Sequence, residues 1–209
     1  MSTKGVERLA PLMGVLFVVL IAVAVAVGGE TPDVGDDSTA SIVRFWKEND
    51  TDQAWTSIIG AWATFAFVWF AASVYSVLRA AEAGVARLSA LSFGGALIGA
   101  TGFLALLSIG FAAAESADDV PPAVLVTLTA LDNNFFFMIA VGFGLFFAST
   151  GLLALRTGVL PAWASWLTIL IGIVCISPIG FFALLVGLIW IVVMSIVLYR
   201  RGASAPSTV

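Results

Sequence analysis

Residues 132–155 read DNNFFFMIAVGFGLFFASTGLLAL, and this stretch decides the fold class. After Asp132 and two asparagines it contains no charged residue. A helix needs ~20 mostly apolar residues to cross the ~30 Å hydrocarbon layer of a membrane, and the run after Asn134 meets that length. The whole chain of 209 residues is 61% hydrophobic and only 11% charged. We therefore predict an all-α, polytopic transmembrane helical bundle.

The hydropathy pattern outward from this stretch predicts six spans in one domain over residues 1–202, followed by a disordered tail over 203–209. The spans lie at about 10–28, 56–78, 89–113, 132–155, 161–177 and 179–199. The last two could instead form a re-entrant hairpin, because the fifth span is short. The first could be a cleaved signal peptide, because it ends in the A-x-A pattern Ala24-Val25-Ala26.

The distribution of basic residues predicts the orientation of the bundle. With the N-terminus inside, seven of the nine lysines and arginines fall on the inner side, and only Arg44 and Lys47 fall outside. Eleven of the thirteen acids fall outside. The positive-inside rule then predicts that both termini lie in the cytoplasm. The lipid bilayer is the expected surroundings of the bundle.

The composition excludes several kinds of chemistry. The chain has no histidine and a single cysteine, which argues against histidine-ligated haem, most zinc sites and a CxxC redox pair. Charged residues lie outside the spans or at their edges, whereas proton relays need ionisable groups within the membrane. We predict no catalytic residues, no metal or other cofactor and no nucleic-acid partner. One alternative is a metal site at Asp33, Asp36 and Asp37, which otherwise form a solvated acidic loop.

The first outer loop contains the pattern of a short amphipathic helix. Ser38 is a good N-cap residue for a helix over 39–48, and Ile42, Phe45 and Trp46 share one of its faces. This helix is expected to lie in the outer interface. It either seals the bundle or forms a lid over a lateral opening or a docking surface.

Small residues repeat at helical spacing in two spans and predict close helix packing. This packing is either within the chain or in a homo- or hetero-oligomer. The residues are Gly95, Gly99 and Gly102 in the third span and Ala140, Gly144, Ala148 and Gly151 in the fourth. In the second span an aromatic stripe of Trp62, Phe65 and Trp69 either contacts lipid and neighbouring helices or forms a cage for a flat apolar ligand.

The polar group Asp132-Asn133-Asn134 is expected at the outer interface, about twenty residues before Arg156 at the inner surface. It is either a polar helix boundary or a polar floor beneath the loop helix, with Asp132 paired to Arg44 or Lys47. The candidate contact residues for a ligand or partner protein are Asp132, Asn133, Asn134, Arg44, Trp46, Trp62, Phe65 and Trp69.

Several segments resemble a family of uncharacterised six-helix integral membrane proteins that is common in high-GC actinobacteria. They include RLAPLMGVLFVVL (8–20), ALRTGVLPAWASWL (154–167) and LIWIVVMSIVLYRRG (188–202). The resemblance covers nearly the whole chain and implies a bacterial plasma membrane. From the residues themselves we expect a non-enzymatic accessory or assembly subunit of a membrane complex. The alternative is a protein that binds or transports a lipid or another hydrophobic small molecule.

Overall fold

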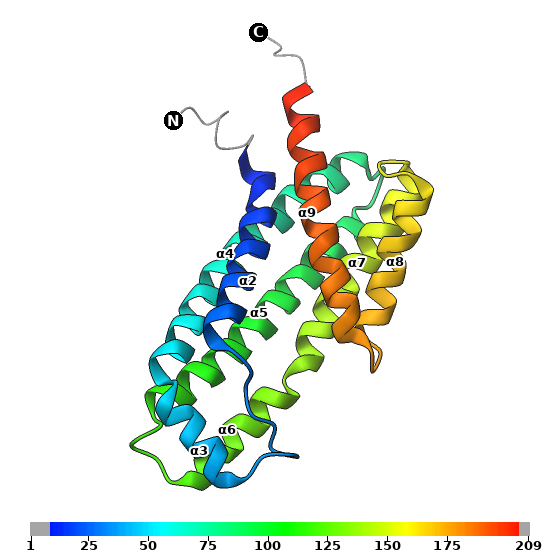
Figure 1. Ribbon diagram of the computed structural model, residues 1–209. Helices are drawn as coiled ribbons and strands as arrows, with labels where there is room; N and C mark the ends of the chain where they lie inside the picture. Colours follow the sequence, from blue (N-terminus) through cyan, green and yellow to red (C-terminus); the bar gives the residue numbers. More distant parts are fainter. Residues whose placement is uncertain (1–8, 205–209) are drawn as a thin grey trace.

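Helices form all the regular structure of the computed structural model, which describes residues 9–204 (Figure 1). The predicted tail over 203–209 lies outside this range except for residues 203 and 204, which continue the last helix. Lys4, Glu7 and Arg8, which are predicted to be cytoplasmic, also lie outside the described residues. In chain order the elements are η1 (Ala10–Leu12), α2 (Met13–Gly28), α3 (Thr39–Glu48), α4 (Asp50–Ala81), α5 (Arg87–Glu115), α6 (Pro122–Asn134), α7 (Phe136–Thr157), α8 (Ala162–Cys175) and α9 (Gly180–Ser204).

Five helical segments in the described part of the chain are long and apolar enough to cross a membrane, one fewer than the sequence predicts. They are Ala10–Gly28, Asp50–Ala81, Arg87–Glu115, Pro122–Thr157 and Gly180–Arg201. The segment predicted as the fifth span is helix α8, which has 14 residues. At ~1.5 Å per residue α8 is about 21 Å long, shorter than the ~30 Å hydrocarbon layer.

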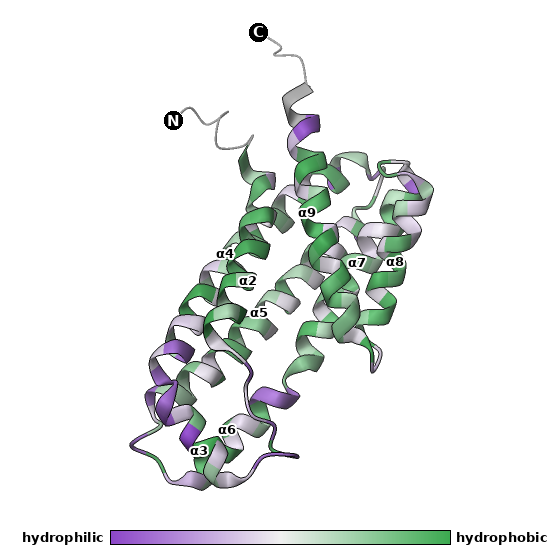
Figure 2. Ribbon diagram, viewed as in Figure 1, coloured by the Kyte–Doolittle hydropathy of each residue, from purple (hydrophilic) through white to green (hydrophobic). Residues whose placement is uncertain are grey.

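Helices α4 and α5 are longer than the predicted spans over 56–78 and 89–113. The ends of α4 and α5 project past the end of α2 (Figure 1). There α3 contacts both helices and α6 packs on α5. We call α3 and α6, together with the α5 end that they cover, the cap. Figure 2 shows most hydrophilic residues around the cap, its loops and the start of α4, a few at the opposite helix ends, and hydrophobic residues along the bundle. The fold therefore has a long apolar bundle and a more polar cap at one end.

The stretch 132–155 does not form a single helix. Helix α6 ends at Asn134, the chain turns at Phe135, and α7 begins at Phe136. The Phe135 N–H donates to the Asp132 carbonyl, and the Asn134 side chain donates to the Ala130 carbonyl at 2.8 Å. The polar group Asp132–Asn134 is thus the last turn of α6, at the junction of cap and bundle.

Close packing of backbones organises the bundle around α7. A Cβ added to Gly142 would overlap the backbone nitrogen and Cα of Gly99, and one added to Gly95 would lie 2.6 Å from the Phe146 nitrogen. On the α8 side, a Cβ added to Gly172 would lie 2.5 Å from the Ala148 nitrogen. Helices α5, α7 and α8 therefore approach closely because glycines line both contacts.

The loop between α4 and α5 is closed by a carboxylate cap. Glu82 accepts hydrogen bonds from the Ser89 hydroxyl at 2.6 Å and from the backbone N–H groups of Leu88 and Ser89 at 2.9 and 3.0 Å. The Ser89 hydroxyl contributes most to a lowered pKa of the Glu82 carboxyl, and the net shift is downward despite partial desolvation, which acts in the opposite direction. The negative charge also lies at the N-terminus of α5, where the helix dipole favours it.

We expect Glu82→Gln to remove an acid-sensitive part of the stability. Because the folded pKa lies below the usual 4.5, the contribution of Glu82 is complete above that pH and disappears as the pH falls through the folded value. Thermal unfolding in a mild detergent between neutral and acidic pH should show a lower Tm for the variant at neutral pH. It should also show a smaller loss of Tm on acidification. Parallel Tm curves for variant and parent would contradict this role.

Candidate functional site

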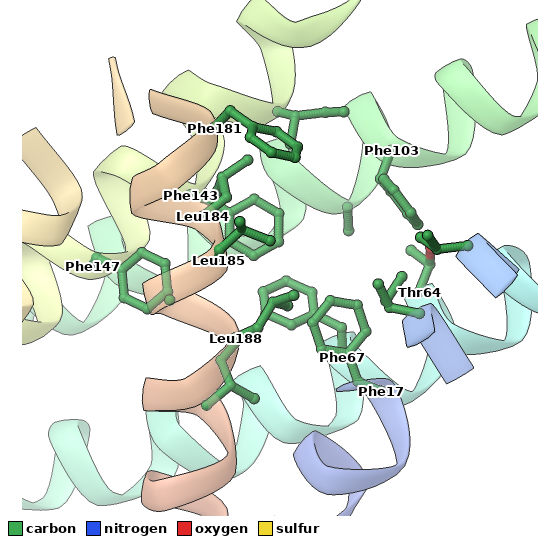
Figure 3. Close-up of a pocket in the computed structure, with 16 residues that line it drawn as sticks. Phe17, Thr64, Phe67, Phe103, Phe143, Phe147, Phe181, Leu184, Leu185 and Leu188 are labelled. Carbon is green, nitrogen blue, oxygen red and sulfur yellow. The ribbon is translucent and has the colours of Figure 1, made fainter. Parts of the chain in front are cut away.

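An apolar cavity of about 280 Å³ lies inside the bundle among α2, α4, α5, α7 and α9 (Figure 3). Its walls are almost entirely aromatic and aliphatic. The lining residues are Phe17, Ile21, Val25, Thr64, Phe67, Ala100, Phe103, Ile139, Phe143, Phe147, Phe181, Leu184, Leu185, Gly187, Leu188 and Ile191. Small-molecule sites are typically concave and largely apolar, with volumes of ~300–1,000 Å³.

The cavity wall, as the described residues form it, contains no charged side chain and no side-chain hydrogen-bond donor that remains free. Its one polar side chain, Thr64, is buried and donates its hydroxyl proton to the Gly60 carbonyl at 2.9 Å. At Gly187 the backbone of α9 lies directly against the Phe147 ring, because glycine has no side chain. An occupant of this space must therefore be apolar, because burying an unpaired polar group would be costly.

The first and last helices of the bundle form the opening of the cavity. Near the chain ends α2 and α9 are in close contact, since a Cβ on Gly14 would overlap the Ser195 hydroxyl. Toward the cap the two helices diverge (Figure 1). There the lining residues Val25, Phe181 and Leu185 are 66%, 60% and 45% exposed. The cavity therefore opens sideways, toward the space that lipid chains occupy around a membrane-spanning bundle.

A second pocket, of about 260 Å³, adjoins the cavity on the side of the cap. The two share the wall residues Ile21, Val25 and Phe103. The second pocket adds polar groups to an otherwise apolar lining. These groups are Gln53, Thr56 and Ser57 of α4, the α6 residue Asp132, and Trp46 of the overlying helix α3.

Helix α3 is held above this polar pocket by buried contacts. Ser38 caps its start by accepting a hydrogen bond from the Ser41 N–H at 3.2 Å. Ile42 and Trp46 are each 1% exposed and pack with Leu125 of α6 and alanines of α5. The Trp46 indole N–H donates to the Thr129 hydroxyl at 2.8 Å. The apolar face of α3 therefore lies on the protein.

The chain between α2 and α3 is fastened to the end of α6 by Asn133. Its side-chain oxygen accepts from the Val34 N–H at 3.2 Å, and its amide nitrogen donates to the Pro32 carbonyl at 3.2 Å. This loop also supplies Thr31 to the wall of the polar pocket. Asn133 thus holds in place one side of that pocket.

Several predicted contact residues meet at this junction, and others do not. Asp132 and Trp46 both line the polar pocket. Asn134 is exposed and bonds within its own helix. Arg44 lies in a separate recess with the acids of the first loop. Asp132 forms no ion pair among the described residues, so the predicted pairing with Arg44 or Lys47 is wrong. Lys47 pairs with Asp118 instead, at 2.9 Å.

The aromatic stripe of α4 faces away from the cavity. Trp62, Phe65 and Trp69 are 61%, 51% and 42% exposed. Their rings contact one another in sequence, with centroids 5.9 and 5.7 Å apart. The cavity uses the opposite side of the same helix, through Thr64 and Phe67. The stripe is therefore an outward surface and does not form part of this site.

The small-residue faces lie in contacts within the chain. Gly95, Gly99 and Gly102 approach α7, and Gly144, Ala148 and Gly151 approach α8. Ala140 of α7 is buried. The acids Asp33, Asp36 and Asp37 line a recess with Arg44, and no group of three potential metal ligands occurs within residues 9–204.

Sequence reasoning missed the cavity residues, because Phe, Leu and Ile that line a cavity have the same pattern as those that fill a core. Thr64 is the one polar residue among the described lining residues, but it gives no clear signal because hydroxyls such as Thr101 and Thr150 also lie in apolar runs without lining the cavity.

Together these features define the class of the protein: an α-helical bundle with membrane-length helices and an apolar cavity that opens sideways between its first and last helix. No family model matches the chain, and neither a characterised protein nor a solved structure is significantly similar to it. The function is therefore inferred from the geometry of the site.

Proposed function

We propose that the protein is a non-enzymatic integral membrane protein that binds the apolar chain of a lipid or a similar hydrophobic molecule in the cavity between α2 and α9. One observation carries the proposal: an apolar cavity whose rim residues Val25, Phe181 and Leu185 are exposed on the lateral surface. An apolar molecule could enter such a cavity directly from the bilayer. The absence of histidine from the chain supports a binding rather than a catalytic role.

The proposed orientation places both termini in the cytoplasm and the cap outside. The terminal turns of α4, α5, α7 and α9 on the side away from the cap contain Arg79, Arg87, Arg156 and Arg201. The positive-inside rule favours that side as cytoplasmic. We further propose that α8 completes a sixth crossing. A Cβ on Gly180, just after the α8–α9 turn, would lie 3.2 Å from the ring of Phe136, the first residue of α7. The α8–α9 turn therefore lies beside the start of α7, at the opposite end of that helix from Arg156. The resemblance to actinobacterial proteins supports a bacterial plasma membrane.

We expect Ala100→Phe to abolish binding, because Ala100 is buried in the cavity wall and a phenyl ring there would occupy the space. The matched control is Ala72→Phe, which adds the same ring at an exposed position of α4. Native mass spectrometry of protein purified gently from its own membrane should detect a bound lipid in the parent and the control, and a loss of at least about tenfold in Ala100→Phe. Equal occupancy in all three proteins would exclude this cavity as the binding site.

The accessory-subunit role is a second candidate. The observation that favours it is the exposed aromatic stripe of Trp62, Phe65 and Trp69, which presents a continuous ring surface outside the bundle. Aromatic side chains are enriched at protein interfaces. A protein partner that copurifies in fixed stoichiometry with the parent, and is lost from a Trp62→Ala and Trp69→Ala double variant, would support this role.

A further inference from the structure

We infer that the polar pocket beneath α3 selects the head group of the bound molecule, and that it takes an amphiphile whose polar end donates hydrogen bonds and carries no negative charge. This inference rests on the proposed function, because it assigns the other end of the molecule whose chain lies in the cavity. Because the two spaces adjoin at Ile21, Val25 and Phe103, one amphiphile that extends past these side chains would occupy both.

The first step concerns the side-chain donors of the polar pocket, most of which already have partners within the described residues, apart from the Thr31 hydroxyl and the second N–H of the Gln53 amide. The Thr56 hydroxyl donates to the Ala24 carbonyl at 3.3 Å, and the Ser57 hydroxyl donates to the Gln53 carbonyl at 3.0 Å. The Gln53 side-chain amide donates to the Gly28 carbonyl at 2.6 Å. The Trp46 N–H is directed to Thr129. These groups thus present mainly oxygen lone pairs to an occupant.

The second step concerns Asp132, which adds a carboxylate to these acceptors. Its side chain is partly buried, lines the pocket, and has no hydrogen bond or ion pair within the described part of the chain. A Cβ on Gly110 of α5 would lie 4.0 Å from the Asp132 Oδ1 atom and 3.8 Å from the Ser57 Oγ atom. The Ser57 and Asp132 oxygens therefore both lie beside Gly110, where the absence of a side chain leaves room for a ligand group.

The third step is electrostatic. The basic residues of the first loop are directed elsewhere, since Lys47 pairs with Asp118 and Arg44 lines a separate recess with acidic residues. A protonated amine would supply the missing positive charge and donate up to three hydrogen bonds, whereas a hydroxyl would supply one donor without charge. A carboxylate or phosphate head group would meet mainly acceptors, together with the like charge of Asp132.

The test compares three probes that have the same saturated alkyl chain: an alkylamine, an alkanol and a fatty acid. Radiolabelled probes are bound to the purified full chain in nanodiscs of zwitterionic lipid. The Ala100→Phe variant gives the background of nonspecific partition into the disc. We expect the amine to bind most tightly, then the alkanol, with the fatty acid at least about tenfold weaker than the amine.

The decisive variant is Asp132→Asn, which keeps the shape of the side chain and removes its charge. We expect it to abolish the preference for amine over fatty acid while the alkanol still binds. A Ser57→Ala variant should weaken the alkanol and the amine together by a smaller factor. A thermal unfolding curve like that of the parent shows that the variants are folded.

The outcomes separate this inference from the proposed function. If all three probes bind equally well to the parent, and Ala100→Phe abolishes all binding, the cavity binds chains but the head-group inference is wrong. If the preference for the amine persists in Asp132→Asn, the inference is also wrong. If no probe binds above the Ala100→Phe background, both the inference and the proposed function fail.

Discussion

Trp46→Ala should release helix α3 from the cap and lower the stability of that region by about 3–5 kcal/mol, the usual cost of truncating a buried tryptophan. Trp46 is 1% exposed and is the largest side chain of the small core that joins α3 to α6. The truncation also leaves the Thr129 hydroxyl without its indole donor. Because that core is separate from the main bundle core, the loss should be local.

Hydrogen exchange followed by mass spectrometry measures this effect directly. In Trp46→Ala the amides of residues 29–48 should exchange much faster, while those of α5 and α7 keep their protection. The matched control is Trp55→Ala, because Trp55 is 55% exposed on α4 and its loss should leave α3 protected. Trp46→Phe, which keeps most of the packing and removes the hydrogen bond, should cost only about 1 kcal/mol. Unchanged exchange in Trp46→Ala would mean that other contacts hold α3.

Gly142→Ala should destabilise the main bundle, at the upper end of the ~1–3 kcal/mol typical of overpacking. A methyl group at Gly142 would overlap the backbone of Gly99, and neither backbone can move aside as a flexible side chain can. Helices α5 and α7 would have to separate along their shared face. A global loss of stability is therefore expected, and it should appear as a lower Tm in detergent.

Gly94→Ala is the control for this substitution. Gly94 lies in α5, one residue before the packed Gly95, and a Cβ there would meet no atom within 4 Å. The alanine should stabilise the helix by up to about 1 kcal/mol through its better helix propensity. A Tm of Gly142→Ala equal to that of the parent would show that the α5–α7 contact is looser than the structure indicates.

The helical class and much of the cap could be predicted from the sequence because they depend on local patterns. Apolar run length predicts membrane-length helices, and the residues Ser38, Ile42 and Trp46 predict a capped helix with one apolar face. That face packs on α6 through contacts between residues far apart in the chain, such as the Trp46–Thr129 bond across 83 positions. No local pattern encodes such a partner.

The break at Phe135 and the cavity could not be predicted for a similar reason. The polar group Asp132–Asn134 is predicted as a possible helix boundary, and helix α6 does end at Asn134. The sequence does not show that the chain turns at Phe135, which is neither proline nor glycine, before α7 begins at Phe136. The cavity exists because five helices leave space between them, and this spacing depends on the whole bundle. Residues such as Leu184 and Phe143 suit a filled core equally well, so their identity does not predict a cavity. Asp132 was identified as a candidate because a charge beside an apolar run is conspicuous, but its surroundings became visible only once α3, α4 and α5 were placed around it.

The pairing of α2 with α9 has a consequence for biosynthesis. These two helices are the first and last of the bundle, and they form the two sides of the opening. Membrane helices emerge from the ribosome in chain order, so α2 can pack on α4 early, whereas the wall made by Phe181, Leu184 and Leu188 arrives last. Every earlier stage of synthesis has an open groove in place of the cavity. A chain that is truncated before Gly180 would therefore retain most of its helices and have no enclosed binding site.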